Sequence, residues 1–248
     1  DNPTADPPVL GPPDSVIVQP TILTMEMIAS GPDDKTATGP NYPRSYTIVV
    51  DIADGQTLTG FHITDSLPNN VSFLSFTATP GGYTAGSPSP PGIPYNVPDN
   101  DVVLAWSSMT GGPGSDDVMV VIEFFVPFDD ADGNPIVPCG TGSGVSINDA
   151  RIEGHWVPLD IRDPELDITH DPSPDDHILM DKCVTVHNDV QVVVDNGSPG
   201  LTPGDILEHT IDFQVSDYHA FNDLVLTDEF SDGQALEGVP TLEVADGH

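Results

Sequence analysis

A segment that occurs twice in the chain constrains its fold more than any other feature. The first copy covers residues 46–67 and contains YTIVVDI, a turn and FHITDSL. The second covers residues 209–228 and contains HTIDFQV, a turn and NDLVLTD. The copies align without a gap, and each reads as a strand, a polar turn and a second strand that ends in Thr-Asp. Self-similarity at a fixed offset indicates a repeat architecture, which favours a structural role over catalysis.

The charge of the chain limits its partners. Among 248 residues, 5 are Lys or Arg and 40 are Asp or Glu, giving a net charge of -35. Such a chain repels nucleic acid and anionic membrane surfaces, and it requires counter-ions. Only 8 of the acids are Glu. Because Asp suits turns and tight oxygen-ligand loops, bound calcium is favoured over adaptation to high salt, which stays open as the alternative.

Short apolar runs separated by turns rich in Pro and Gly fill most of the chain, and no helical periodicity is present. The strands expected in the first half cover residues 15–29, 45–52, 58–64, 71–78, 101–107, 118–128 and 145–156. About eight short strands with turns between them are typical of a β-sandwich. No apolar run is long enough for a membrane-spanning helix, so membrane insertion is not expected.

The repeat divides the chain into parts. We expect an extended N-terminal arm at 1–14, a first β-sandwich at 15–156, an Asp/Pro-rich linker at 157–178, and a second, partial β-sandwich at 179–248. The second part has strands expected at 222–228 and 241–244, but nothing that matches residues 84–156 of the first. Half a sandwich exposes an apolar edge and is unstable alone. Either the chain is a fragment, or another chain supplies the missing strands.

Several motifs resemble a known family. They are Tyr46-Thr47-Ile48, Thr64-Asp65-Ser66-Leu67-Pro68, Val71-Ser72-Phe73 and Asn148-Asp149-Ala150 in the first part, and Lys182, Pro203-Gly204-Asp205 and Thr227-Asp228 in the second. The pattern is similar to the conserved-repeat domain of large bacterial and archaeal cell-surface proteins. That resemblance covers about residues 20–156 and 179–245. It implies all-β, tandem immunoglobulin-like β-sandwich domains, the second incomplete, in an extracellular stalk-like or surface-layer role, with no catalytic residues.

Asp130-Ala131-Asp132-Gly133-Asn134 is the sharpest local motif. Oxygen donors at alternate positions around a Gly suit Ca²⁺, and Asp129 offers a further ligand. An EF-hand is excluded because no acid follows at 135–141. An ordinary Asp/Gly hairpin turn explains the same residues. The sequence thus predicts Asp129, Asp130, Asp132 and Asn134 as calcium ligands, with the linker acids as a second candidate.

The sequence offers two candidate covalent cross-links. Cys139 and Cys183 are the only cysteines, and in an extracellular protein they suit a disulfide between the two parts, with two unpaired buried thiols as the alternative. Surface sandwiches also form Lys–Asn isopeptide bonds between their first and last strands. The first part has Asn148 but carries Met25 or Met27 where a Lys is needed. The isopeptide bond is therefore not expected there.

These observations favour a non-enzymatic extracellular protein that self-assembles into a polymer. We expect a subunit or segment of a surface filament or stalk, stiffened by calcium, in which residues 1–28 of one subunit add strands to the open sandwich of the next. The alternative is an adhesin whose loops, such as 79–100 and 108–117, bind a sugar or protein on another surface. Only Tyr83 and Tyr95 supply aromatic side chains there, so the support for an adhesin is weak.

Overall fold

The structure is a computed structural model that describes most of the chain between Thr21 and Val244. The described residues are 21–30, 35–86, 101–114, 116–130, 132–136, 139, 144–160, 162–171, 178–231 and 233–244. The arm expected at 1–14 lies outside them. Within this part of the chain the structure has fourteen strands, and no helix is long and apolar enough to cross a membrane.

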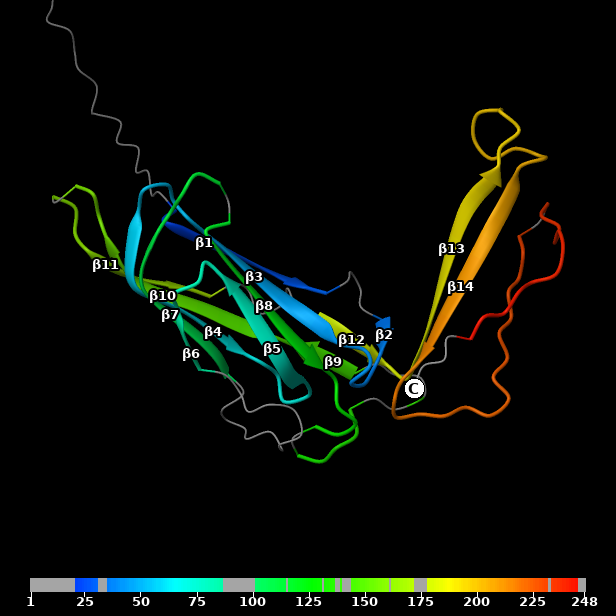
Figure 1. The fold of residues 1–248 in the computed structure, drawn as a ribbon, viewed down its shortest axis with the longest axis horizontal. Helices are drawn as coiled ribbons and strands as arrows, with labels where there is room; N and C mark the ends of the chain where they lie inside the picture. Colours follow the sequence, from blue (N-terminus) through cyan, green and yellow to red (C-terminus); the bar gives the residue numbers. More distant parts are fainter. Residues whose placement is uncertain are drawn as a thin grey trace, which may run out of the picture.

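Two antiparallel sheets pack face to face to form a first module (residues 21–171) (Figure 1). One sheet has the order β1 (Leu23–Ala29), β3 (Arg44–Ile52), β8 (Val118–Phe125) and β5 (Ser72–Thr79). The other has the order β11 (Leu166–His170), β10 (Asp149–Val157), β4 (Thr57–Ser66), β7 (Asp101–Thr110) and β6 (Thr84–Gly86). This confirms the β-sandwich that the alternating strands predicted and the immunoglobulin-like fold that the resemblance implied.

The core of the first module follows directly from that alternation. Along β3 every second residue is buried, beginning with Arg44 and Tyr46. The Tyr46 ring stacks on that of Phe124, with 4.5 Å between the centroids. Phe61 of the opposite sheet packs against Trp106 at 5.6 Å. Burying each such apolar side chain stabilises the fold by roughly 1.5–3 kcal/mol, so this layer holds the two sheets together.

A small third sheet connects the two halves of the chain. It consists of β9 (Gly144–Ile147), β12 (Ile178–Lys182) and β2 (Lys35–Ala37), with β12 antiparallel to β9 and parallel to β2. Part of residues 157–178, the segment expected to be a linker, is instead a strand. It contains β11, which pairs with β10 and extends the second sheet of the sandwich.

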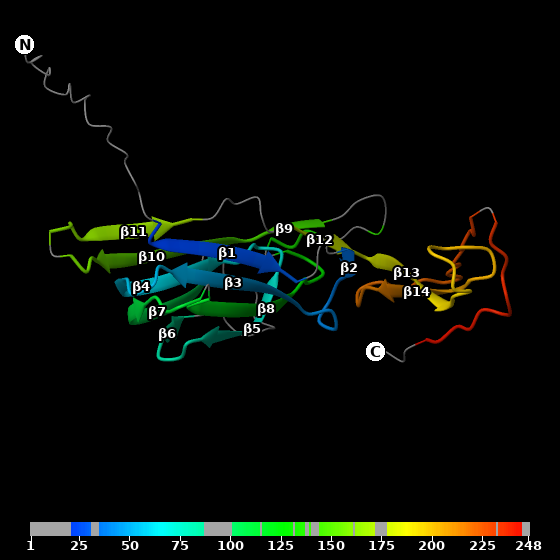
Figure 2. The same ribbon diagram turned by 90° about the horizontal axis from the view of Figure 1, so that it is seen from above.

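The described part of the second module (residues 183–231 and 233–244) contains one hairpin, formed by β13 (Val184–Val194) and β14 (Ile206–Val215). Figure 2 shows this hairpin beyond one end of the sandwich, with the rest of the chain looping beside it. Its pairing repeats that of β1 with β3. Asn188 lies opposite Ile211 as Met27 lies opposite Ile48.

The strands expected at 222–228 and 241–244 are not formed. In the first module the equivalent strand β4 is held between β10 and β7, and β5 is held by β8. The described part of the second module has no equivalents of β7, β8 and β10. Without those neighbouring strands the backbone of residues 222–228 and 241–244 has no hydrogen-bonding partners. A sequence pattern similar to that of β4 and β5 therefore does not form strands here.

Candidate functional site

The junction between the modules is closed by a disulfide. Cys139, in the segment between β8 and β9, is bonded to Cys183, directly before β13, with an S–S distance of 2.00 Å. The bridge joins residues 44 positions apart. Cross-linking across such a loop removes freedom from the unfolded chain and stabilises the fold by up to about 4 kcal/mol.

Hydrogen bonds reinforce the same junction. The Tyr42 hydroxyl donates to the carbonyl of Val215 at 2.7 Å. The backbone N–H and side-chain amide of Asn41 donate to the two carboxylate oxygens of Asp217, at 2.8 and 3.0 Å. The Tyr218 hydroxyl donates to the carbonyl of Val126 at 3.0 Å. The hairpin is therefore held against the sandwich by contacts on several sides.

Gly39 is required where the two modules touch. Its φ of +133° lies in the region that favours Gly. A Cβ at this position would lie 2.2 Å from the Asp217 carboxylate. The close approach of Asp217 thus depends on the absence of a side chain at position 39.

The hairpin exposes an apolar face. On β14 the residues that match the buried positions of β3 are half-buried, and those between them are exposed. Val186 of β13 is 61% exposed, although its counterpart Met25 in β1 packs against the core. Further along, Val225 and Val239 are 79% and 88% exposed. Exposed apolar surface of this extent is typical of interaction sites.

The predicted calcium loop forms a tight turn. Oδ1 of Asp130 accepts the backbone N–H groups of Asp132 at 2.9 Å and Asn134 at 2.8 Å, and the Asn134 amide approaches both carboxylate oxygens at 3.2 and 3.3 Å. These bonds hold the pKa of Asp130 below its usual range. Asp129, at the start of the turn, forms an isolated antiparallel β-bridge with Pro135. The structure therefore places the four predicted ligands in one turn, where Asp130 already accepts backbone donors.

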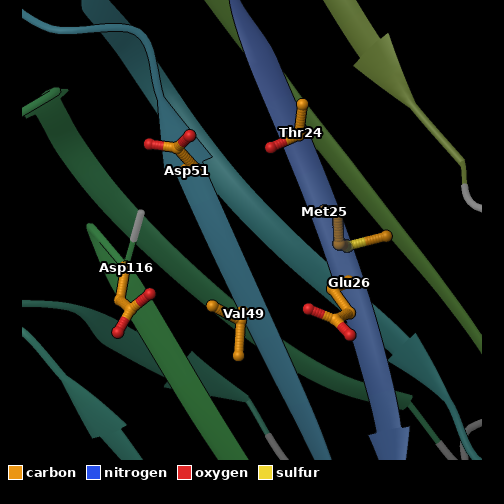
Figure 3. Close-up of a pocket in the computed structure, with 6 residues that line it drawn as sticks. All are labelled: Thr24, Met25, Glu26, Val49, Asp51 and Asp116. Carbon is orange, nitrogen blue, oxygen red and sulfur yellow. The ribbon is translucent and has the colours of Figure 1, made fainter. Parts of the chain in front are cut away.

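Other described acids do not form a compact cation site. Glu26, Asp51 and Asp116 surround a shallow depression of about 230 Å³ on the outer face of β1 and β3 (Figure 3). Among the described residues, the one group of three His, Cys, Asp or Glu donor atoms within 4.8 Å of one another is Cys139, Cys183 and His219. Two of these are already bonded to each other in the disulfide.

A buried polar site in the first module was not anticipated from the sequence. Asp65 of β4 is completely buried, and its carboxylate oxygen Oδ2 lies 2.6 Å from Nδ2 of Asn148, which is also buried. The same Nδ2 lies 3.5 Å from the sulfur of Met27. Oδ1 of Asp65 and Oδ1 of Asn148 are buried with no hydrogen-bond partner among the described residues.

Burial governs the chemistry of this site. Desolvation raises the pKa of Asp65 to about 8, against the lowering effect of the Asn148 hydrogen bond, and the nearby charges of Asp149 and Asp101 raise it further. Asp65 is thus a neutral acid at neutral pH. Met27 stands where an isopeptide bond needs a Lys, and a thioether cannot form an amide. The sequence signal that could have indicated this buried site is the Thr-Asp pair at the end of each copy of the repeat.

The loop aromatics do not form a binding surface in the described residues. Tyr83 packs between Trp106 and Phe76, with centroid distances of 5.4 and 6.0 Å. Tyr95 lies outside the described residues. No described aromatic of these loops therefore supports the adhesin alternative.

Comparisons with known proteins find solved structures of low sequence identity. No protein-family description and no curated protein matches the chain. One similar solved structure is the major pilin subunit of Bacillus cereus, with a TM-score of 0.37 and 11% identity over 78% of this chain and 56% of the pilin. Another is the collagen-binding subdomain of an Enterococcus faecalis surface protein, with a TM-score of 0.32 and 10% identity over 64% of this chain and 95% of that subdomain. The chain spans little more than half of the pilin, and the resemblance to the conserved-repeat family stays a prediction.

Proposed function

We propose that this chain is a structural subunit or segment of an extracellular filament or stalk on a cell surface. The observation that carries the proposal is the junction, where the disulfide and the bonds to Val215 and Asp217 hold two β-modules in tandem. A stalk transmits force and keeps its reach only if its modules do not fold back on one another. A cross-linked junction keeps the two modules in a fixed arrangement. An extracellular location keeps the disulfide oxidised.

Assembly by strand addition is the second part of the proposal. The hairpin β13–β14 has an apolar face, and among the described residues no strands cover it as they cover the same face of the first module. Strands from another subunit would pair with the free edge and bury that face. Such a contact joins two different surfaces, so it need not close and can continue into a fibre.

Calcium is the third part. Asp129, Asp130, Asp132 and Asn134 are the proposed ligands, supported by their oxygen atoms in one tight turn. Binding requires the Asn134 amide to turn its oxygen toward the ion and release Asp130. A bound ion would also offset part of the repulsion within a chain of net charge -35.

The test is electron microscopy and light scattering of the purified full chain, with and without a calcium chelator. Fibres that loosen or dissolve on chelation support both assembly and calcium. Fibres that are unaffected by the chelator support assembly and contradict stiffening by calcium. Monodisperse monomers under every condition would contradict the filament.

A further inference from the structure

A histidine lies beside the disulfide at the junction. Sγ of Cys139, Sγ of Cys183 and a ring nitrogen of His219 all lie within 4.8 Å of one another. The two sulfurs are bonded to each other, and His219 takes no part in that bond. Because an imidazole takes up a proton near neutral pH, His219 has the chemistry needed to assist the reaction that forms the disulfide.

Several contacts hold the His219 side chain in this place. Its Nδ1 lies 2.8 Å from Oγ of Ser216, a residue that is only 2% exposed. The backbone N–H of His219 donates to the carbonyl of Ser216 at 3.3 Å, and the N–H of Ser216 donates to the carbonyl of Cys183 at 2.8 Å. On another side the centroid of the Phe128 ring lies 6.2 Å from that of the imidazole. The imidazole is thus tied through Ser216 to one of the two cysteines.

The contact with Ser216 also decides which ring nitrogen is able to act. A neutral imidazole has one N–H and one free lone pair, and the hydrogen bond made by one nitrogen sets the role of the other. With the proton on Nδ1, donated to Oγ of Ser216, the lone pair of Nε2 is left to accept a proton. Asp217, two residues before His219, has its carboxylate bonded to Asn41 instead.

The rest of the junction does not depend on the disulfide. The hydroxyl groups of Tyr42 and Tyr218 donate to backbone carbonyls across the two modules, at 2.7 and 3.0 Å. These bonds are able to form while Cys139 and Cys183 are still thiols. They hold the two cysteines near each other, so that closure of the disulfide becomes an intramolecular reaction between positioned groups.

The two cysteines differ in access to solvent. Cys139 is exposed, whereas Cys183 is half-buried and packs against the core of the first module. A small-molecule disulfide such as oxidised glutathione therefore reaches Cys139 more readily. Since a thiolate and not a thiol attacks a disulfide, the half-buried thiol of Cys183 needs a nearby base to take its proton.

We propose that His219 is the general base that closes the Cys139–Cys183 disulfide, with Ser216 as the residue that positions it. Cys139 loses its proton to water and attacks a small-molecule disulfide, whose S–S bond breaks. One small thiolate leaves, and a mixed disulfide remains on Cys139.

In the closing step the Cys183 thiol gives its proton to Nε2 of His219, and its sulfur attacks Sγ of Cys139. The bond between Cys139 and the small molecule breaks, and the second small thiolate leaves and takes up the proton. Two protein thiols are oxidised in all, and one small disulfide is reduced to two thiols.

The experiment follows closure in the full chain, which is first reduced with a dithiol, freed of reductant and mixed with oxidised glutathione. Samples quenched in acid are resolved by intact mass spectrometry into reduced, mixed-disulfide and closed forms. In His219→Ala we expect closure at pH 7 to be about three- to tenfold slower, because a thiol without a base is only a few per cent ionised there. The mixed disulfide should accumulate. His187→Ala, at an exposed position of β13, is the matched control and should close like the unaltered chain.

The pH dependence separates a base from a residue that only packs. At about pH 9.5 a cysteine thiol ionises without help, so His219→Ala should close there as fast as the unaltered chain. Ser216→Ala keeps the imidazole and loses its hydrogen bond, and it should close more slowly at pH 7 alone. A normal rate for His219→Ala at pH 7, or an equal slowing at both pH values, overturns the proposal. Both readouts are independent of whether the chain forms fibres.

Discussion

At the scale of single residues, Asp65 makes the stability of the first module depend on pH. Its pKa is about 8 in the folded chain, against about 3.9 for an exposed Asp. A raised folded pKa means that the stabilisation is fully present below about pH 4 and is lost as the pH rises to about 8. By pH 7 the loss amounts to roughly 4 kcal/mol. We expect the melting temperature to fall between pH 5 and pH 8.

The Asp65→Asn variant isolates this effect because an amide cannot ionise. Its melting temperature should vary much less over the same pH range. Asp51→Asn, on the outer face of the first sheet, controls for the general repulsion within an acidic chain and should keep the dependence of the unaltered protein. If D65N and D51N melt alike at every pH, Asp65 is not the group responsible.

Met27 decides whether the same site forms a covalent cross-link. The amide nitrogen of Asn148 lies 3.5 Å from the Met27 sulfur and 2.6 Å from the neutral acid Asp65. In Met27→Lys, we expect the lysine amine to attack the Asn148 side-chain carbonyl, forming an amide and releasing ammonia, with Asp65 available to transfer protons. Intact mass spectrometry should show the loss of one ammonia. Met27→Lys combined with Asp65→Asn should keep the full mass.

At the scale of elements, the junction depends on the contact between the loop before β3 and the end of β14. Asp217→Ala removes the acceptor of two hydrogen bonds from Asn41. Because these bonds are exposed, we expect the free energy of unfolding to fall by about 1 kcal/mol. We also expect a wider range of angles between the modules. Small-angle scattering should show a broader distribution of dimensions. Asp212→Ala, on the exposed face of β14, is the matched control.

Elements also show how far the sequence predicts this fold. The strands of the first module follow from alternation, because every second residue of β3 and β8 meets a buried layer. The same alternation at 222–228 predicted a strand that is absent, because pairing depends on neighbours that the local sequence does not reveal. The contact of Asp65 with Asn148 was missed for a related reason. It arises from sheet packing between residues 83 positions apart.

The predicted calcium motif gives a similar lesson. Its residues do meet in one turn, as the spacing of Asp130, Asp132 and Asn134 implied. The sequence could not show that the Asp130 carboxylate accepts backbone N–H groups there. Ligand and turn-forming roles use the same oxygen atoms, so only a binding measurement separates them.

At the scale of the whole molecule, the net charge of -35 opposes both compact folding and association of copies. Added salt screens this repulsion, since the Debye length falls from about 30 Å at 0.01 M to about 10 Å at 0.1 M. We therefore expect NaCl alone to raise the melting temperature and to speed fibre formation. This general response must be subtracted before any effect is assigned to a calcium site.

Comparing CaCl₂ with NaCl at equal ionic strength separates the two effects. If the turn at Asp130 binds Ca²⁺, calcium should raise the melting temperature beyond NaCl, because binding to the folded state alone adds stability. Asp130→Asn should lose that excess. Asp205→Asn is the matched control, since Asp205 accepts backbone N–H groups of Asn196 and Thr202 in the hairpin loop and lies outside the proposed site. Equal responses to both salts would mean that screening alone compensates for the acidity of this chain.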